Sequence, residues 1–248
     1  MGRNMSLLKL VWLTAALIAI SPTLSGQSSF RIDTDIYADI EKEPIMRSLT
    51  LFSECVCYDF DNTKTKLVTI IDPGQQRIVL LNPDKRVKAE IQMSEIEQRL
   101  ANATEQMTPE QKEAMARSNG IERDSTTGEI VVRNKSVEYR CTTQKVEKAE
   151  IAGLYCQFAD WSARLNAIYP PHWPAYLRLE LNSAVAAENA VPKDLQKITR
   201  INGKERRLTA KHISNRLLSD EDQKLIIRAQ GMLAYPSIGV DQFIKAFK

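Results

Sequence analysis

The sequence has little of the chemistry on which most enzymes depend. Its only histidines are His172 and His212, and neither belongs to a His-Glu-x-x-His motif or to a Cys/His cluster that binds zinc. The nine glycines are dispersed, which excludes a glycine-rich phosphate loop. Gly-x-Ser-x-Gly, the motif around many hydrolase nucleophiles, is also absent. We therefore expect a protein that is not an enzyme and that holds neither a cofactor nor a metal.

The chain also lacks a strong excess of charge. The formal net charge is +3 over 248 residues, and two of the cations lie in the first ten residues. The basic cluster Lys204–Arg207 stands beside a predicted turn, where charged side chains are usually solvated. We therefore expect no nucleic-acid partner.

The N-terminus has the pattern of a secretory leader. Arg3 and Lys9 precede the uncharged run 10–20, and small residues around Ser25 allow cleavage. We assign residues 1–26 to a signal peptide and expect the mature protein to be periplasmic or extracellular. An uncleaved anchor is the alternative, although the run is shorter than the roughly 20 apolar residues of a membrane span.

Four cysteines in an exported chain favour disulfides over metal or free thiols. Cys141 and Cys156 flank a charged segment, and a hairpin reversing there would place them opposite each other as a cross-strand disulfide. Cys55 and Cys57 would point to the same face of one strand, 46–60. Packing or disulfide formation explains that pair better than redox chemistry, which needs a nearby cation or a helix N-terminus.

Tight turns between β-rich runs predict an antiparallel sheet. Pro73 and Gly74 predict a type II-like turn with a positive φ at the glycine. Asn202-Gly203 is the strongest hairpin signal. The strands expected are 30–37, 46–60, 66–71, 77–81, 86–91, 129–133, 136–144, 151–160, 195–201 and 205–213.

Helical patterns interrupt and follow these strands. Ser94 and Glu97 form a capping box, and Pro109 and Gly120 mark the start and end of a second helix, so 94–119 is a predicted helical insertion. Three further helices are expected at 175–188, from Ser219 to about 229, and from Ser237 to the C-terminus. Helices grouped around sequential antiparallel strands indicate an α+β fold.

The order of elements resembles an exported superfold. A leader, the strand 30–37, a meander with 69–72 and 79–83, the helical insertion, and the later 151–156 followed by Trp161 are similar to the lipoprotein-carrier-like superfold, which includes periplasmic carriers of outer-membrane lipoproteins. This resemblance implies a single domain at 27–248 with a strongly curved antiparallel sheet, an incomplete β-barrel covered by helices. The concave face of that sheet can shelter acyl chains. No residue here matches, by motif, the characteristic cavity arginine of the carriers.

The resemblance implies an apolar groove and a covering helix. The residues expected to line this groove are Ile96, Leu100, Met107, Tyr155, Phe158 and Trp161. The function expected is non-enzymatic binding of lipid, an acyl chain or another hydrophobic ligand. The alternative is a structural or protein-interaction module of the cell envelope, with a filled core and an envelope protein as its partner.

Overall fold

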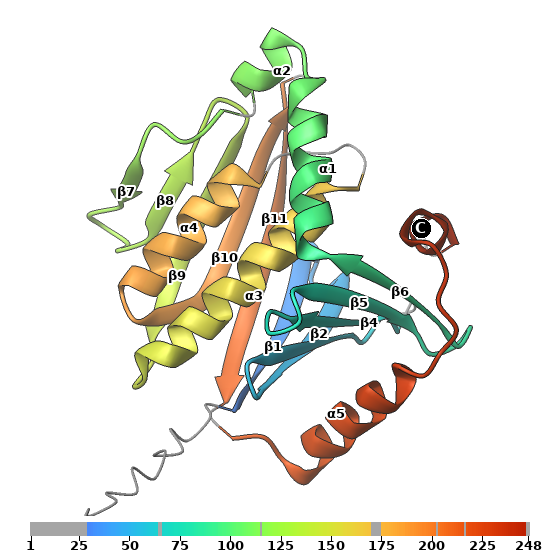
Figure 1. The fold of residues 1–248 in the computed structure, drawn as a ribbon. Coiled ribbons are helices and arrows are strands. Elements are labelled where there is room, and N and C mark those ends of the chain that lie inside the picture. The colour runs from blue at the N-terminus through green and yellow to red at the C-terminus, as the bar shows by residue number, and fades with distance from the viewer. Residues whose placement is uncertain are drawn as a thin grey trace, which may run out of the picture.

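The computed structural model describes residues 29–63, 66–114, 116–169, 175–201, 203–215 and 217–246. The predicted leader and His172 lie outside these residues. The described chain is α+β, with eleven strands in one open antiparallel sheet and six helices (Figure 1). The sheet order is β6-β5-β4-β3-β2-β1-β11-β10-β9-β8-β7, so β6 and β7 are its edges.

The strands are β1 (Phe30–Ala38), β2 (Met46–Ser53), β3 (Val56–Asp61), β4 (Val68–Asp72), β5 (Arg77–Asn82), β6 (Val87–Gln92), β7 (Ile121–Arg123), β8 (Ile130–Arg133), β9 (Val137–Lys145), β10 (Ala190–Ile201) and β11 (Lys204–Asn215). The helices are α1 (Met93–Glu105), α2 (Pro109–Ala114), α3 (Ala149–Ala167), α4 (Tyr176–Ala187), α5 (Asp220–Met232) and α6 (Val240–Ala246).

The meander predicted from the turns is confirmed, but its turn chemistry differs. The loops after Asp72 and Asn82 are alike, because each of these side chains accepts a hydrogen bond from the backbone N–H three residues later, at 3.1 and 2.8 Å. The positive φ falls on the last loop residue, Gln76 (53°) or Arg86 (52°), and Gly74 does not adopt one. The predicted type II-like turn is therefore wrong.

The single strand predicted at 46–60 is also wrong. It is the hairpin β2–β3, and both residues of its two-residue turn, Glu54 and Cys55, have positive φ, at 52° and 64°. Such a turn matches the twist of a hairpin. Cys55 is exposed at the turn and Cys57 is buried in β3, so the two thiols do not share one strand face. The pattern hid the turn because Glu-Cys carries none of the residues that usually mark positive φ.

The main error concerns residues 151–160, which were predicted as a strand and form the middle of helix α3. Its buried residues Ala152, Tyr155 and Ala159 recur at helical spacing. The strands that pair with β9 are β10 and β8, not a strand at 151–160. Cys141 lies in β9 and Cys156 in α3, and both thiols are free, so the predicted cross-strand disulfide is not formed.

The N-terminal caps of the helices agree with the sequence signals at α5 but not at α1. Helix α1 begins at Met93 with Gln92 as its N-cap and no side-chain cap, so the capping box predicted at Ser94 is wrong. The capping box at the start of α5 is present, between Ser219 and Asp222. The hairpin β10–β11 and helices α4 and α6 are also confirmed.

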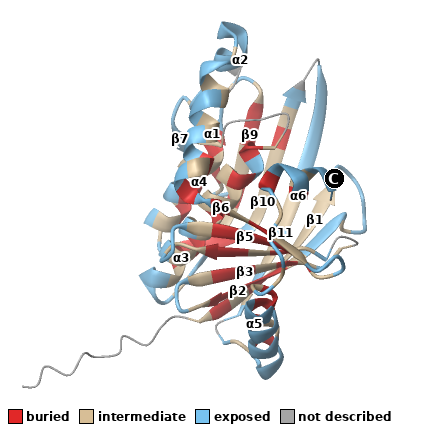
Figure 2. Ribbon diagram, turned by 45° about the vertical axis from the view of Figure 1, so that its right-hand side comes forward, coloured by how far each residue is buried: buried red, intermediate tan, exposed pale blue. Residues whose placement is uncertain are grey.

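The sheet buries apolar side chains on two faces. On the face that we call inner, Phe52 and Ile78 belong to a cluster with residues of α1, α3 and α6. On the opposite, outer face, Leu51 and Val79 pack with α5. Successive side chains of a strand point to opposite faces, and both faces are covered here. Strand β5 is therefore buried along an unbroken apolar run, 78–81 (Figure 2). Within the described ranges, no helix is long and apolar enough to cross a membrane.

A third apolar cluster joins helix α4 to the other half of the sheet. Leu177, Leu181 and Val185 pack against β8, β9 and the start of β10. Helix α4 lies beside α3 in both ribbon views (Figures 1 and 2). The two helices therefore rest on different parts of the sheet and meet along one seam.

Candidate functional site

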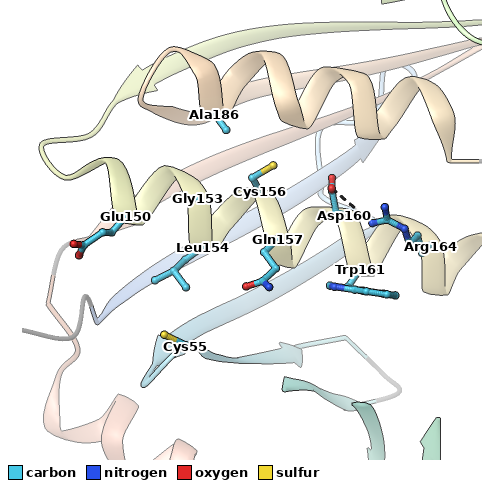
Figure 3. Close-up of a pocket in the computed structure, with 10 residues that line it drawn as sticks. All are labelled: Cys55, Glu150, Gly153, Leu154, Cys156, Gln157, Asp160, Trp161, Arg164 and Ala186. Atoms are coloured by element: carbon cyan, nitrogen blue, oxygen red, sulfur yellow. Dashed lines mark ion pairs between the residues drawn. The ribbon is translucent and has the colours of Figure 1, made fainter. Parts of the chain in front are cut away.

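One groove runs along helix α3 and has a volume of about 980 Å³. Helix α3 forms its floor, α4 borders one side and the turn of hairpin β2–β3 borders the other (Figure 3). Its lining residues are Cys55, Glu150, Gly153, Leu154, Cys156, Gln157, Asp160, Trp161, Arg164 and Ala186. From Glu150 to Arg164 the floor spans roughly 20 Å at the helical rise per residue.

The middle of this floor has a glycine, which leaves open space above the helix, next to the apolar side chain of Leu154. A side chain built at Gly153 would meet nothing within 4 Å, so the groove is open above it. Leu154 and Trp161 are partly buried beneath the groove and pack on the inner-face cluster. The charged residues lie toward the ends, where the Arg164 guanidinium stands 5.0 Å from the centre of the Trp161 ring. The groove therefore combines an apolar middle with a fixed cation at one end.

A second groove, of about 540 Å³, lies between α1 and α4. Leu100 of α1, Met107 just after α1 and Leu179 of α4 supply apolar surface. Arg117 and Arg164 also line this groove. Because Arg164 lines both grooves, they meet at its side chain.

The residues predicted to line an apolar groove divide between these two sites and the core. Trp161 lies in the groove along α3. Leu100 and Met107 lie in the second groove, and Leu100 also packs on the inner-face cluster. The structure therefore places these three residues at accessible surfaces, but not in one common groove.

The other three predicted residues fill the core. Ile96 is fully buried and Tyr155 is 4% exposed. Phe158 meets the Phe52 ring edge-on, with centroids 5.6 Å apart and planes at 83°. These side chains pack between helix and sheet, so they do not line an open cavity.

A polar cluster lies beneath the seam between α3 and α4. The Tyr155 hydroxyl is 3.4 Å from Nε2 of His212 in β11. Asn182 of α4 donates from Nδ2 to the Asp160 carboxylate of α3 at 2.7 Å. Arg178, one turn before Asn182, is close enough to affect the pKa values of Tyr155 and His212. Sequence reasoning missed this cluster, because it read 151–160 as a strand.

Burial holds the titratable members of the cluster in their neutral forms. It raises the pKa of the Tyr155 phenol and lowers that of His212 to about 4. The positive charge of Arg178 further lowers the pKa of His212. The Lys193 carbonyl favours the protonated ring, but Nδ1 of His212 makes no hydrogen bond of normal geometry with it.

Another titratable group with a shifted pKa, the half-buried Asp59, lies on the inner face of β3. The Asp59 carboxylate accepts a hydrogen bond from Oγ1 of Thr50 at 2.7 Å. Burial raises the pKa of Asp59 to about 6, although the Thr50 hydroxyl opposes this shift and the charge of Asp61 adds to it.

No group of three or more potential metal ligands comes together in the part of the chain that the structure describes. Comparison with known protein families and with curated proteins found no match to this chain. The functional argument therefore rests on the geometry of the two grooves and the polar cluster.

Proposed function

We propose that this is an exported, non-enzymatic protein that binds lipid or another hydrophobic ligand. In this proposal the sheet is strongly curved, an incomplete β-barrel with helices as its cover, and residues 1–26 direct export. The likeness to the lipoprotein-carrier-like superfold belongs to the same proposal. An open antiparallel sheet with helices on its inner face is compatible with it.

The observation that carries the proposal is the groove along α3. Its volume of about 980 Å³ lies at the upper end of the range typical of ligand sites, roughly 300–1,000 Å³. The apolar floor around Leu154 and Trp161 suits an acyl chain laid along the helix. Burial of apolar ligand surface contributes about 25 cal/mol per Å² before the costs of ordering.

The filled inner-face cluster changes where a ligand would bind. Tyr155 and Phe158 occupy the space between α3 and the sheet, so the proposed site is the surface groove of α3 and not a cavity beneath the helix. Binding there requires no covalent chemistry.

Filling the groove tests the proposal directly. Gly153→Trp places a large ring where nothing lies within 4 Å of the added Cβ, so it should block the groove without disturbing the core. Gly231→Trp is the matched control, because Gly231 is also a helical glycine with open space and lies in α5, away from the groove. The readout is displacement of a fluorescent fatty acid, with mass spectrometry of copurified lipid.

We expect the wild type and Gly231→Trp to bind the probe, and Gly153→Trp to lose at least about tenfold in affinity. Equal affinity of all three proteins would exclude the groove along α3. Absence of both copurified lipid and probe binding would reject lipid binding altogether.

The alternative is a structural or protein-interaction module of the cell envelope, and one observation favours it. Ile40, Ile45 and Met46 are 42–96% exposed around the β1–β2 connection. Leu208, 40% exposed, pairs with Ala38 at the end of β1 and lies beside them. Contiguous exposed apolar residues often mark partner surfaces. Loss of lipid binding with retained capture of an envelope protein would favour this alternative.

A further inference from the structure

Unsatisfied polar atoms are concentrated under the seam between α3 and α4. Among the described residues, four buried side-chain nitrogen or oxygen atoms lack a hydrogen-bond partner. Three of them belong to the polar cluster: Nη1 of Arg178, Oδ1 of Asn182 and Nδ1 of His212. Buried polar groups are nearly always paired, so such a concentration points to a partner outside the chain, either ordered water or a ligand.

The charge of Arg178 is also left without a counter-ion. No ion pair joins it to a carboxylate within the described ranges. The groups that it influences are Tyr155, His212, Cys141 and Cys156, and burial favours the neutral form of each. The Asp160 and Asp194 carboxylates also act on these groups, but neither forms an ion pair with Arg178 in the described part of the chain. The half-buried guanidinium can therefore take an anion as its partner.

The nearest acid on α3 is already occupied. Asp160 accepts from Asn182 at 2.7 Å and forms an ion pair with Arg164 at 3.6 Å. It lies between the groove along α3 and the seam, and both Asp160 and Cys156 point from α3 toward α4 (Figure 3). Arg178 is close enough to affect the pKa of Cys156, which lines the groove, so the polar cluster lies beside the α4 side of the groove.

We propose that Arg178 is the anion-binding end of the ligand site, which takes the carboxylate or phosphate group of an amphiphile whose apolar part lies along α3. This inference rests on the proposed function for the apolar part of the ligand. The guanidinium donates to the oxyanion from Nη1, as arginine does in most carboxylate and phosphate sites. Asn182 and His212 offer further polar atoms to the bound head group or its water.

The structure also predicts an unusual mutational signature. Replacing Arg178 by Met removes a half-buried charge that has no ion pair, while keeping a long apolar stem. We expect Arg178→Met to melt at a temperature equal to or above that of the wild type, and to lose its preference for anionic ligands. Arg133→Met is the control, because Arg133 pairs with Glu122 on an exposed strand away from both grooves.

The experiment compares a long-chain fatty acid with the fatty alcohol of the same chain length. The wild type and Arg133→Met should bind the acid at least about tenfold more tightly than the alcohol, whereas Arg178→Met should bind the two alike. An unchanged preference in Arg178→Met would overturn the proposal. If Arg178→Met does not fold, Arg178→Gln replaces it in the same comparison.

A third arm uses inorganic phosphate and separates this proposal from the function on which it rests. If neither amphiphile binds the wild type, the proposed function fails. A phosphate-dependent rise in melting temperature in the wild type but not in Arg178→Met would then assign the site to a free anion. No difference between the two proteins in that arm would overturn the anion site as well.

Discussion

Two half-buried groups, Asp59 and His212, should give this protein opposite and largely cancelling responses to acid. Asp59 has its pKa raised by burial to about 6, from an ordinary value of 3.8. His212 has its pKa lowered by burial to about 4, from 6.5. Folding therefore favours the protonated form of Asp59 and the neutral form of His212. As pH falls from 7 to 4, Asp59 adds stability and His212 removes it.

The magnitudes are similar. Each pKa unit corresponds to about 1.4 kcal/mol, so each group changes the free energy of unfolding by roughly 2–3 kcal/mol over this range. The contribution of Asp59 is fully present below its unfolded value and is lost as pH rises through about 6. The contribution of His212 is present above 6.5 and is lost as pH falls through about 4. In the wild type the two contributions therefore oppose each other and largely cancel.

Single substitutions should expose each component. Relative to the wild type, Asp59→Asn should lose roughly 2–3 kcal/mol of stability between pH 7 and 4, while His212→Asn should gain a similar amount. Urea unfolding at four pH values measures both, and Asp84→Asn, at an exposed turn, should follow the wild type. Differences from the wild type remove the contribution of other carboxylates. Parallel pH profiles of stability for all four proteins would refute the opposing contributions of Asp59 and His212.

Three further outcomes are expected. Asp222→Ala should lower the free energy of unfolding in urea by about 3–5 kcal/mol, because Asp222 is 2% exposed, caps α5 and pairs with Arg31 of β1 at 2.9 Å. The control Glu221→Ala removes an exposed side chain and should change little. Equal effects of the two substitutions would contradict the pairing of Asp222 with Arg31. In the native protein only Cys55 should react rapidly with a thiol reagent, since it is the one exposed thiol; equally fast labelling of the others, or none at Cys55, would be inconsistent with the fold. Glu54→Asn with Cys55→Gly should raise the free energy of unfolding by about 1 kcal/mol, because both positions have positive φ, and a loss of stability would count against the observed turn.

Prediction from sequence succeeded where local chemistry alone decides the structure. Asn202-Gly203 specifies a hairpin because Gly203 takes a φ of 73° without strain. Ser219 and Asp222 form a capping box that depends only on neighbours in the chain. The turn at Glu54-Cys55 escaped detection because strand pairing, and not residue preference, imposes its positive φ.

Helix α3 shows why the candidate site could not be predicted in the same way. Its short apolar run fits a buried strand as well as one face of a helix, and only tertiary packing decides between them. In the helix, Tyr155 and Phe158 lie three residues apart and turn toward the sheet, where they fill the predicted cavity. Arg178 gave no signal, because a single charge on a predicted amphipathic helix normally faces solvent.

The helical conformation of residues 151–160 also determines what kind of ligand site the molecule offers. Had 151–160 been a strand, its aromatic residues would have faced an open inner surface. As a helix, it fills that surface and presents a second face, around Gly153 and Trp161, to the groove. At its seam with α4, Arg178 then lies near Tyr155 and His212, whose neutral forms are favoured by burial. An apolar surface beside a cation that has no ion pair among the described residues suits an anionic amphiphile better than a neutral hydrocarbon. The ligand's head group should therefore decide affinity as much as its chain.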